Sequence, residues 1–114
     1  MKRLETIIKS DKLSEVVNAI KSAGAKGLTV TSIKGKGSGE RPMLRSGRGT
    51  SQIRAEYNIM DSVMTIVDDS EVSKVVSAIS QAAYTGKSGD GIVIVTDVDQ
   101  VVNIASKKTD SDAL

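Results

Sequence analysis

Residues 85–91, TGKSGDG, combine three glycines with one lysine and one aspartate just before the aliphatic run Ile92–Val95. Glycine lets backbone N–H groups turn toward a ligand and lets that ligand approach closely. Successive N–H groups in such a turn can cradle an anion, and Lys87 adds a mobile positive charge. Asp90 is expected to tie the loop's own amides rather than bind a metal. The pattern fits a phosphate-binding loop or an ordinary helix-to-strand connection, and it is not a Walker loop.

A second glycine-rich run with a lysine, GKGSG, occupies residues 35–39. It opens a segment, Lys34–Tyr57, that is far longer than a normal hairpin loop of ~2–5 residues, and such long loops are usually functional or disordered. The segment holds six cations and two anions, a net charge of +4 in a chain whose total is +2. Two glycine-rich loops favour phosphate binding more than either alone. The arginines of the segment are Arg41, Arg45, Arg48 and Arg54.

Composition excludes several kinds of chemistry. The 114 residues include no histidine and no cysteine, so imidazole catalysis, disulfides and the usual zinc sites are excluded. No activated nucleophile or carboxylate pair can be assembled, so we expect no enzyme and no metal site. The small net charge and the near absence of aromatic side chains argue against nucleic-acid binding. No apolar run of ~18 residues is present, so we expect no membrane insertion, and without a signal peptide a cytoplasmic location.

The elements that position both loops come from an internal duplication. Residues 6–23, TIIKSDKLSEVVNAIKSA, align without gaps with residues 65–82, TIVDDSEVSKVVSAISQA. Each copy opens with a β-branched run typical of a strand, and apolar residues at helical spacing follow. Ser10-Asp11 in one copy and Asp69-Ser70 in the other are expected to cap the helices.

A further strand is predicted after each helix, at Gly27–Gly35 and at Ile92–Val98. The order βαβ, repeated, predicts an α+β protein with the ferredoxin-like βαββαβ arrangement, in which both helices cover one face of a four-stranded antiparallel sheet. The run Ile92–Val95 places aliphatic side chains on both faces, so the second face should also be buried. We expect self-association through that face; the alternative is that the C-terminal segment folds back over it. Residues 1–105 form the predicted single domain, and residues 106–114 a polar, loosely held tail.

The glycine-rich loop and its surroundings resemble a known family. TGKSGDGIVIV resembles the signature loop T-G-x-x-G-D-G-K-I-F-V of the PII signal-transduction proteins. Residues 24–37, GAKGLTVTSIKGKG, are similar to the family's second strand and its run into the T-loop, and residues 1–24 to its first strand and helix. The resemblance extends to about Ala105. It implies a homotrimer that binds an adenine nucleotide (ATP, ADP or AMP) in clefts between subunits.

The resemblance also implies a regulatory role. The T-loop, here at about residues 37–57, would dock on a target such as a transporter or metabolic enzyme according to the ligand bound. Many members also bind 2-oxoglutarate with magnesium ATP. The expected function is therefore regulation of nitrogen or carbon metabolism. Ferredoxin-like domains of other classes fit less well, since an acylphosphatase needs an arginine-bearing loop where this chain has Ser10-Asp11, and an RNA-binding module needs aromatic side chains.

Carried over by position, the resemblance implies a set of nucleotide contacts. Thr29 and Ile66 would lie near the adenine. One chain's residues 85–91 would face a neighbour's residues 35–37 across the cleft. The T-loop arginines Arg41, Arg45, Arg48 and Arg54 are candidate contacts to phosphate or partner. The implied phosphate-side residues are Gly35, Lys36, Gly37, Thr85, Gly86, Lys87, Gly89, Asp90 and Gly91.

The chain departs from the family pattern where the family carries charge. Ile92 replaces the lysine of the signature, and Met60 the lysine that holds 2-oxoglutarate. Gly39 replaces the glutamine near magnesium, and Asn103 and Ala105 replace two arginines that reach phosphates. Each charge-assisted contact to phosphate is worth ~1.5–3 kcal/mol. These departures favour ADP or AMP and disfavour magnesium with 2-oxoglutarate. The alternative function is a divergent PII-like sensor of AMP, a cyclic nucleotide, or bicarbonate with ADP, without a 2-oxoglutarate response.

Overall fold

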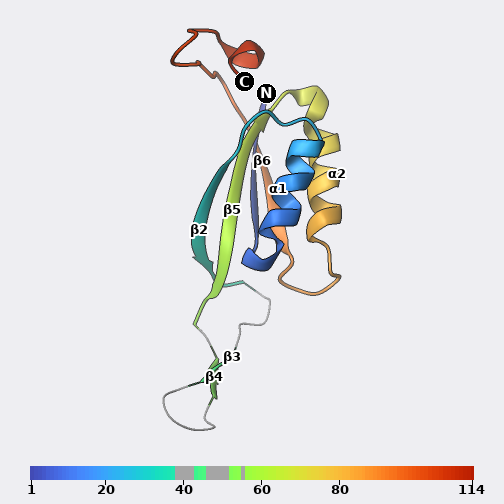
Figure 1. The fold of residues 1–114 in the computed structure, drawn as a ribbon, viewed down its shortest axis with the longest axis vertical. Coiled ribbons are helices and arrows are strands. Elements are labelled where there is room, and N and C mark those ends of the chain that lie inside the picture. Colours follow the sequence, from blue (N-terminus) through green and yellow to red (C-terminus); the bar gives the residue numbers. More distant parts are fainter. Residues whose placement is uncertain (38–42, 46–51, 55) are drawn as a thin grey trace.

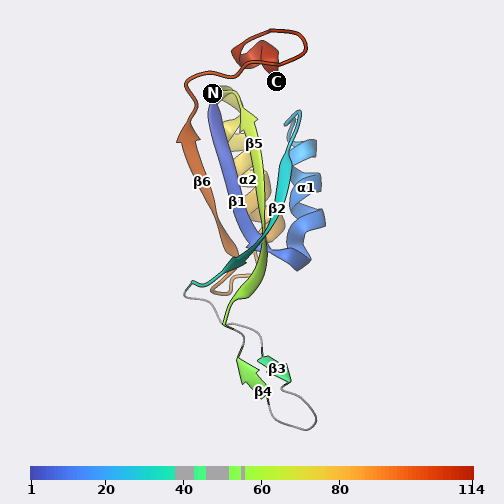
Figure 2. The same ribbon diagram turned by 90° about the vertical axis from the view of Figure 1, so that its left-hand side faces the viewer.

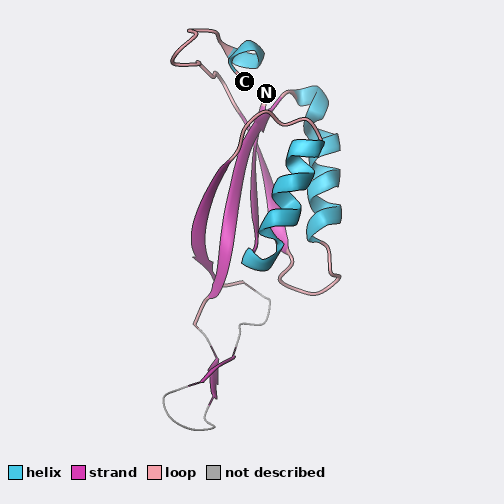
Figure 3. Cartoon of the chain, in the orientation of Figure 1, coloured by secondary structure: helices cyan, strands magenta, loops and turns pink. Residues whose placement is uncertain are grey.

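The computed structural model describes residues 1–37, 43–45, 52–54 and 56–114, and these form an α+β fold of two layers (Figure 1). One layer is an antiparallel sheet with the strand order β2-β5-β1-β6, and the other holds two helices, both on one face of the sheet (Figure 3). This arrangement confirms the predicted ferredoxin-like βαββαβ order. The sheet strands are β1 (Lys2–Lys9), β2 (Thr29–Gly35), β5 (Asn58–Val67) and β6 (Gly91–Asp97), and the helices are α1 (Leu13–Ser22) and α2 (Val72–Ala83).

The duplication predicted from the sequence is visible in the core. Leu4 and Val63, Val16 and Val75, and Ile20 and Ile79 are equivalent positions of the two copies, and each of these side chains is at most 1% exposed. Burying one such side chain contributes about 1.5–3 kcal/mol. The two copies therefore bury matching residues between the helices and one face of the sheet.

The predicted helix caps are not formed. Ser10–Lys12 and Asp69–Glu71 are short 3₁₀ turns that lead into α1 and α2, and neither helix start has a side-chain cap hydrogen bond. A 3₁₀ turn satisfies part of the free N–H groups at a helix start by tighter backbone bonding. The predicted capping residues do lie at the starts of the helices, but they form 3₁₀ turns there and make no side-chain cap hydrogen bonds.

The other face of the sheet is uncovered in the described part of the chain, as Figure 2 shows. The strand register aligns Ile7 with Ile92 and Ile33 with Met60 on this face. Its aliphatic character is interrupted where Arg3 and Glu5 form an ion pair of 2.9 Å. The C-terminal residues lie beyond one end of the sheet and leave this face open (Figure 2). The predicted uncovered face is therefore present, whereas the alternative of a C-terminal cover is not observed.

The C-terminal residues form a compact turn, in contrast to the expected loose tail. The Asn103 side-chain oxygen accepts hydrogen bonds from the N–H groups of Ala105 and Ser106, both at 3.0 Å. Its side-chain amide donates to the Ala113 carbonyl oxygen at 3.3 Å. A short 3₁₀ helix, Asp110–Ala113, ends the chain. Asn103 thus organises the turn.

Candidate functional site

The two glycine-rich turns meet at one end of the sheet. There β2 ends and β6 begins, and a cavity of about 420 Å³ lies between them. Gly35, Lys36 and Gly37 line one side of this cavity, and Gly89 and Gly91 line the other. We expected one chain's residues 85–91 to face residues 35–37 of a neighbouring chain, but both turns line this cavity within a single chain. The remaining lining residues are Ile7, Ile33, Lys34, Asn58, Met60 and Ile92.

Asp90 organises the 85–91 loop from within, as predicted. Its carboxylate accepts hydrogen bonds from the N–H groups of Thr85, at 2.7 Å, and Gly86, at 3.0 Å, and from the Thr85 hydroxyl. The pKa of Asp90 is lowered, chiefly by the Thr85 hydroxyl and then by the backbone bonds and the charge of Lys9. The carboxylate therefore holds the backbone of its own loop.

The glycines of this loop are required by its backbone. Gly86, Gly89 and Gly91 have φ angles of +82°, +96° and +120°, which other residues rarely adopt. Space is also restricted at Gly91, where an added Cβ would lie 2.1 Å from the carbonyl oxygen of Ile7. The glycine pattern therefore reflects a specific loop conformation beside β1.

The duplication breaks at this loop. In one copy the Thr65 hydroxyl donates to the Gly27 carbonyl oxygen at 2.6 Å. The equivalent bond would join Thr6 to Gly86, but the Thr6 hydroxyl is buried with no partner among the described residues. The Gly86 N–H donates to the Asp90 carboxylate within its own loop. The first connection is therefore held by a hydrogen bond to the sheet, whereas the 85–91 loop is held by hydrogen bonds within itself.

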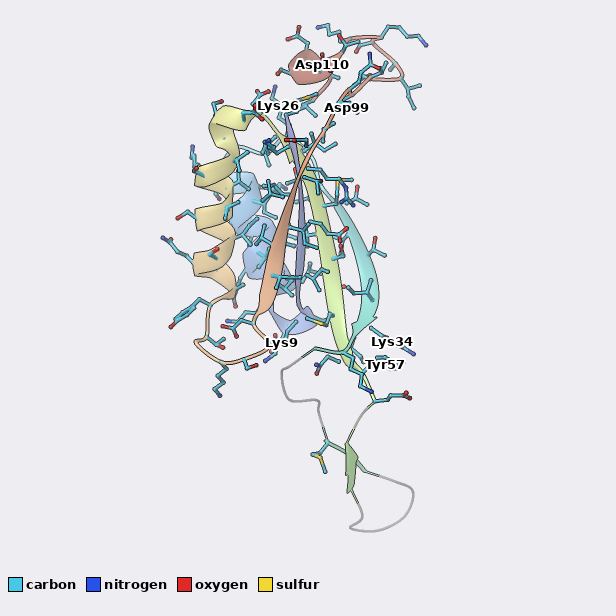
Figure 4. All side chains as sticks on the ribbon, turned by 180° about the vertical axis from the view of Figure 1, so that it is seen from behind. Lys9, Lys26, Lys34, Tyr57, Asp99 and Asp110 are labelled. Atoms are coloured by element: carbon cyan, nitrogen blue, oxygen red, sulfur yellow. The ribbon has the colours of Figure 1, made fainter. Side chains whose placement is uncertain are left out.

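We expect Asp90→Ala to release this loop without unfolding the domain. The N–H groups of Thr85 and Gly86 should then exchange with solvent roughly tenfold faster in hydrogen-exchange NMR, since hydrogen bonds to a charged group are lost. Asp99→Ala, an exposed aspartate at the opposite end of the sheet (Figure 4), is the control. Unchanged exchange in Asp90→Ala would contradict the assigned role.

Acid should have the same effect as that substitution. Because the pKa of Asp90 is lowered, its carboxylate is ionised and holds the loop at neutral pH. An ordinary aspartate has a pKa near 3.9 and is half protonated at that pH, where Asp90 stays mostly ionised. The hydrogen bonds that Asp90 accepts are lost only as the pH falls through its lowered pKa.

Several lysines lie at or near the cavity, and the sequence analysis identified only some of them as site residues. Lys36 and Lys34 line it, and Lys87 is exposed on the loop. Lys9, which we did not predict, ends β1 opposite Met60, and its charge contributes to the lowered pKa of Asp90. Figure 4 shows Lys9 and Lys34 at the same end of the sheet. The signal that could have found Lys9 is its place as the last residue of the first predicted strand.

Apolar side chains give the cavity an aliphatic floor. Ile92, 57% exposed, pairs with Ile7. The Met60 sulfur is close enough to Gly35 that an added Cβ there would lie 2.7 Å from it. Gly39 lies outside the described residues. The cavity thus combines an aliphatic floor with a rim of glycine backbone and lysine side chains.

Thr29 and Ile66 lie at the opposite end of the sheet. They line a second cavity, of about 380 Å³, whose wall includes Lys26, Ala113 and Leu114. Gly35 lies six positions after Thr29 along β2, which is roughly 20 Å of extended strand. Figure 4 shows Lys26 at one end and Lys34 at the other. One chain therefore carries two separate groups of the expected nucleotide contacts.

The arginines of the long segment are only partly described. Arg41 and Arg48 lie outside the described residues. Arg45 and Arg54 belong to a two-stranded ladder of β3 (Met43–Arg45) and β4 (Gln52–Arg54), in which Arg45 pairs with Gln52. In the described ranges, no three acidic, histidine or cysteine side chains gather as a metal site would require. The same residues contain no helix long and apolar enough to cross a membrane.

The fold is that of a ferredoxin-like α+β protein, with two glycine-rich loops lining one cavity at one end of its sheet. The family model "Nitrogen regulatory protein P-II" matches residues 1–108, and the chain belongs to this family. Members of the family are signal-transduction regulators rather than enzymes. Trimeric assembly and adenine-nucleotide binding are typical of them.

Curated relatives agree over the whole length. The chain is 38% identical to a nitrogen regulatory protein P-II of Azospirillum brasilense, with both chains fully covered. It is 36% identical to nitrogen regulatory protein GlnK of Escherichia coli K12, also with both chains covered. It is 35% identical to nitrogen regulatory protein P-II 2 of Methanothermobacter thermautotrophicus, over all of this chain and 97% of the relative.

Proposed function

We propose that this protein is a cytoplasmic homotrimeric regulator that binds an adenine nucleotide between subunits and acts on a target protein through residues 37–57. The target would be a transporter or an enzyme of nitrogen or carbon metabolism. The observation that supports this most is the cavity in which residues 35–37 and the 85–91 loop meet. Glycine N–H groups and the lysines Lys9, Lys36 and Lys87 supply the positive potential that phosphate requires.

The position of the cavity explains how a ligand could control the long segment. Gly37, the first residue of the 37–57 segment, lines the cavity, and Gly35 lines it just before that segment begins. Asn58, at the far end of that loop, lines the same cavity. A phosphate bound there would contact both ends of the segment, so its binding energy can favour one loop conformation over others.

Two features support a trimer with ligands between subunits. The contacts at Thr29 and Ile66 are roughly 20 Å of strand away from Gly35, so one mononucleotide cannot bridge them within a chain. The uncovered sheet face offers the surface on which copies can associate. Association that brings one chain's Thr29 end to another chain's cavity would complete the site.

We expect Ile94→Glu to prevent this association. Ile94 lies on the uncovered face directly opposite Glu5, so the substitution places two carboxylates side by side. The wild-type protein should sediment at about 36 kDa, three times the 12.0 kDa chain, and the variant near the chain mass. Ile104→Glu, at a residue 87% exposed on the C-terminal turn, is the control and should remain trimeric. A wild-type protein that sediments as a single chain would overturn the proposed assembly.

The aliphatic floor favours a ligand with fewer phosphates. Ile92 and Met60 give no charge where the family has lysines, so ADP or AMP is favoured over ATP, and magnesium with 2-oxoglutarate is disfavoured. The same residues favour a second candidate function. In it the protein senses AMP, a cyclic nucleotide, or bicarbonate with ADP, and does not respond to 2-oxoglutarate.

Isothermal titration calorimetry with ATP, ADP, AMP and cyclic AMP, each with and without magnesium and 2-oxoglutarate, tests the proposal. We expect ADP or AMP to bind at least as tightly as ATP, without enhancement by 2-oxoglutarate. Lys87→Gln should weaken phosphate binding, whereas Lys74→Gln, exposed on α2, should not. Failure of every nucleotide would overturn the proposal. Cyclic AMP binding, or bicarbonate dependence with ADP, would select the second candidate.

A further inference from the structure

Lys36 and Tyr57 form a pair at the mouth of the cavity. Lys36 lines the cavity, and its ammonium nitrogen lies 5.9 Å from the centroid of the Tyr57 ring. Tyr57 is 43% exposed and does not line the cavity itself. The ring therefore contacts the ammonium from outside the space that a ligand would occupy.

The strand register brings these two residues together. Gly35 and Asn58 are the last pair of the ladder between β2 and β5, and both line the cavity. Lys36 and Tyr57 are the next residues of the two segments, so they lie opposite each other just beyond the ladder. Figure 4 shows Tyr57 at this end of the sheet, the end at which Lys34 also lies. The backbone that forms the rim of the cavity thus also sets the pair.

A tyrosine in this position can prepare Lys36 for an anion. A free lysine side chain loses rotamer freedom when it contacts a phosphate. A ring face attracts the ammonium and restrains it beforehand, and the ammonium keeps N–H donors on the side away from the ring. The ring and an anion in the cavity can therefore be contacted at the same time.

We propose that Tyr57 is a positioning residue that holds Lys36 toward the anionic group of the ligand in the cavity. This inference takes its ligand from the proposed function.

The first test concerns the pair without any ligand. In NMR spectra of the full chain, the ε-CH₂ protons of Lys36 should be shifted upfield by the ring. The signal is assigned by its loss in Lys36→Gln. Tyr57→Phe keeps the ring and should keep the shift, whereas Tyr57→Leu keeps apolar bulk and should abolish it. A Lys36 signal at the ordinary lysine position in the wild-type protein would overturn the proposal.

The second test measures anion binding by calorimetry with ADP and with inorganic tripolyphosphate. Tyr57→Leu should bind both about 2- to 5-fold more weakly than Tyr57→Phe, the range expected for an exposed cation–π contact. Equal affinities for the two variants, or tighter binding by Tyr57→Leu, would overturn the positioning role alone. Binding of tripolyphosphate but no nucleotide would overturn the proposed function and leave the positioning role standing. Binding of neither anion would overturn both.

Discussion

Replacing Gly91 by alanine is expected to destabilise the fold by roughly 2–5 kcal/mol, because a strained backbone and a steric clash are combined at one residue. The added Cβ would lie 2.1 Å from the Ile7 carbonyl oxygen and 3.2 Å from the Ile8 Cα. Both neighbours are backbone atoms of a central strand, so neither can move without disturbing the sheet. The φ angle of +120° adds a conformation that alanine rarely adopts.

Urea unfolding of the full chain at fixed protein concentration measures this effect. Typical domains are stable by only 5–15 kcal/mol, so the unfolding midpoint should fall markedly. Gly27→Ala is the matched control, since nothing lies within 4 Å of an added Cβ there. Equal midpoints for the two variants would show that the β1–β6 contact is looser than the structure indicates.

Replacing Ile92 by lysine is expected to tighten ATP binding by about tenfold. One charge-assisted contact is worth ~1.5–3 kcal/mol, and the lower end applies at an exposed position. Ile92 is 57% exposed and lines the cavity, so a lysine there has a solvated path to a phosphate and little burial cost. The gain should be larger for ATP than for AMP, because ATP presents more phosphate charge.

Calorimetry of Ile92→Gln alongside Ile92→Lys separates charge from polarity. The glutamine variant removes the same aliphatic surface and adds hydrogen-bonding atoms without a charge. It should bind ATP much as the wild-type protein does. If both variants gain affinity equally, the aliphatic floor itself limits ATP binding, and the missing charge does not.

Local and repeated patterns made the fold predictable from the sequence. The ungapped duplication fixed the order of the elements, and the buried pairs Val16/Val75 and Ile20/Ile79 follow its helical spacing. The role of Asp90 was also predictable, since its partners Thr85 and Gly86 lie within five residues of it. Such contacts depend on few residues, and short-range stereochemistry determines them.

Long-range features were not predictable in the same way. The meeting of residues 35–37 with the 85–91 loop depends on strand directions across the whole sheet. Lys9 enters the site only through its register with Met60. The turn around Asn103 depends on a hydrogen bond to Ala113, ten residues away, and no local sequence motif predicts that bond. In each case the deciding partner is distant in sequence, and composition does not identify it.

The separation of Thr29 from Gly35 by the length of β2 has a genetic consequence. In a closed ring of three, each chain would serve two different clefts, one through each end. A variant damaged only at Thr29, expressed alone, would form rings in which all three clefts are defective. The same holds for a variant damaged only at the 85–91 loop. When the two variants are co-expressed, every ring that contains both has one cleft formed by two intact ends. Two inactive alleles are therefore expected to complement each other in part.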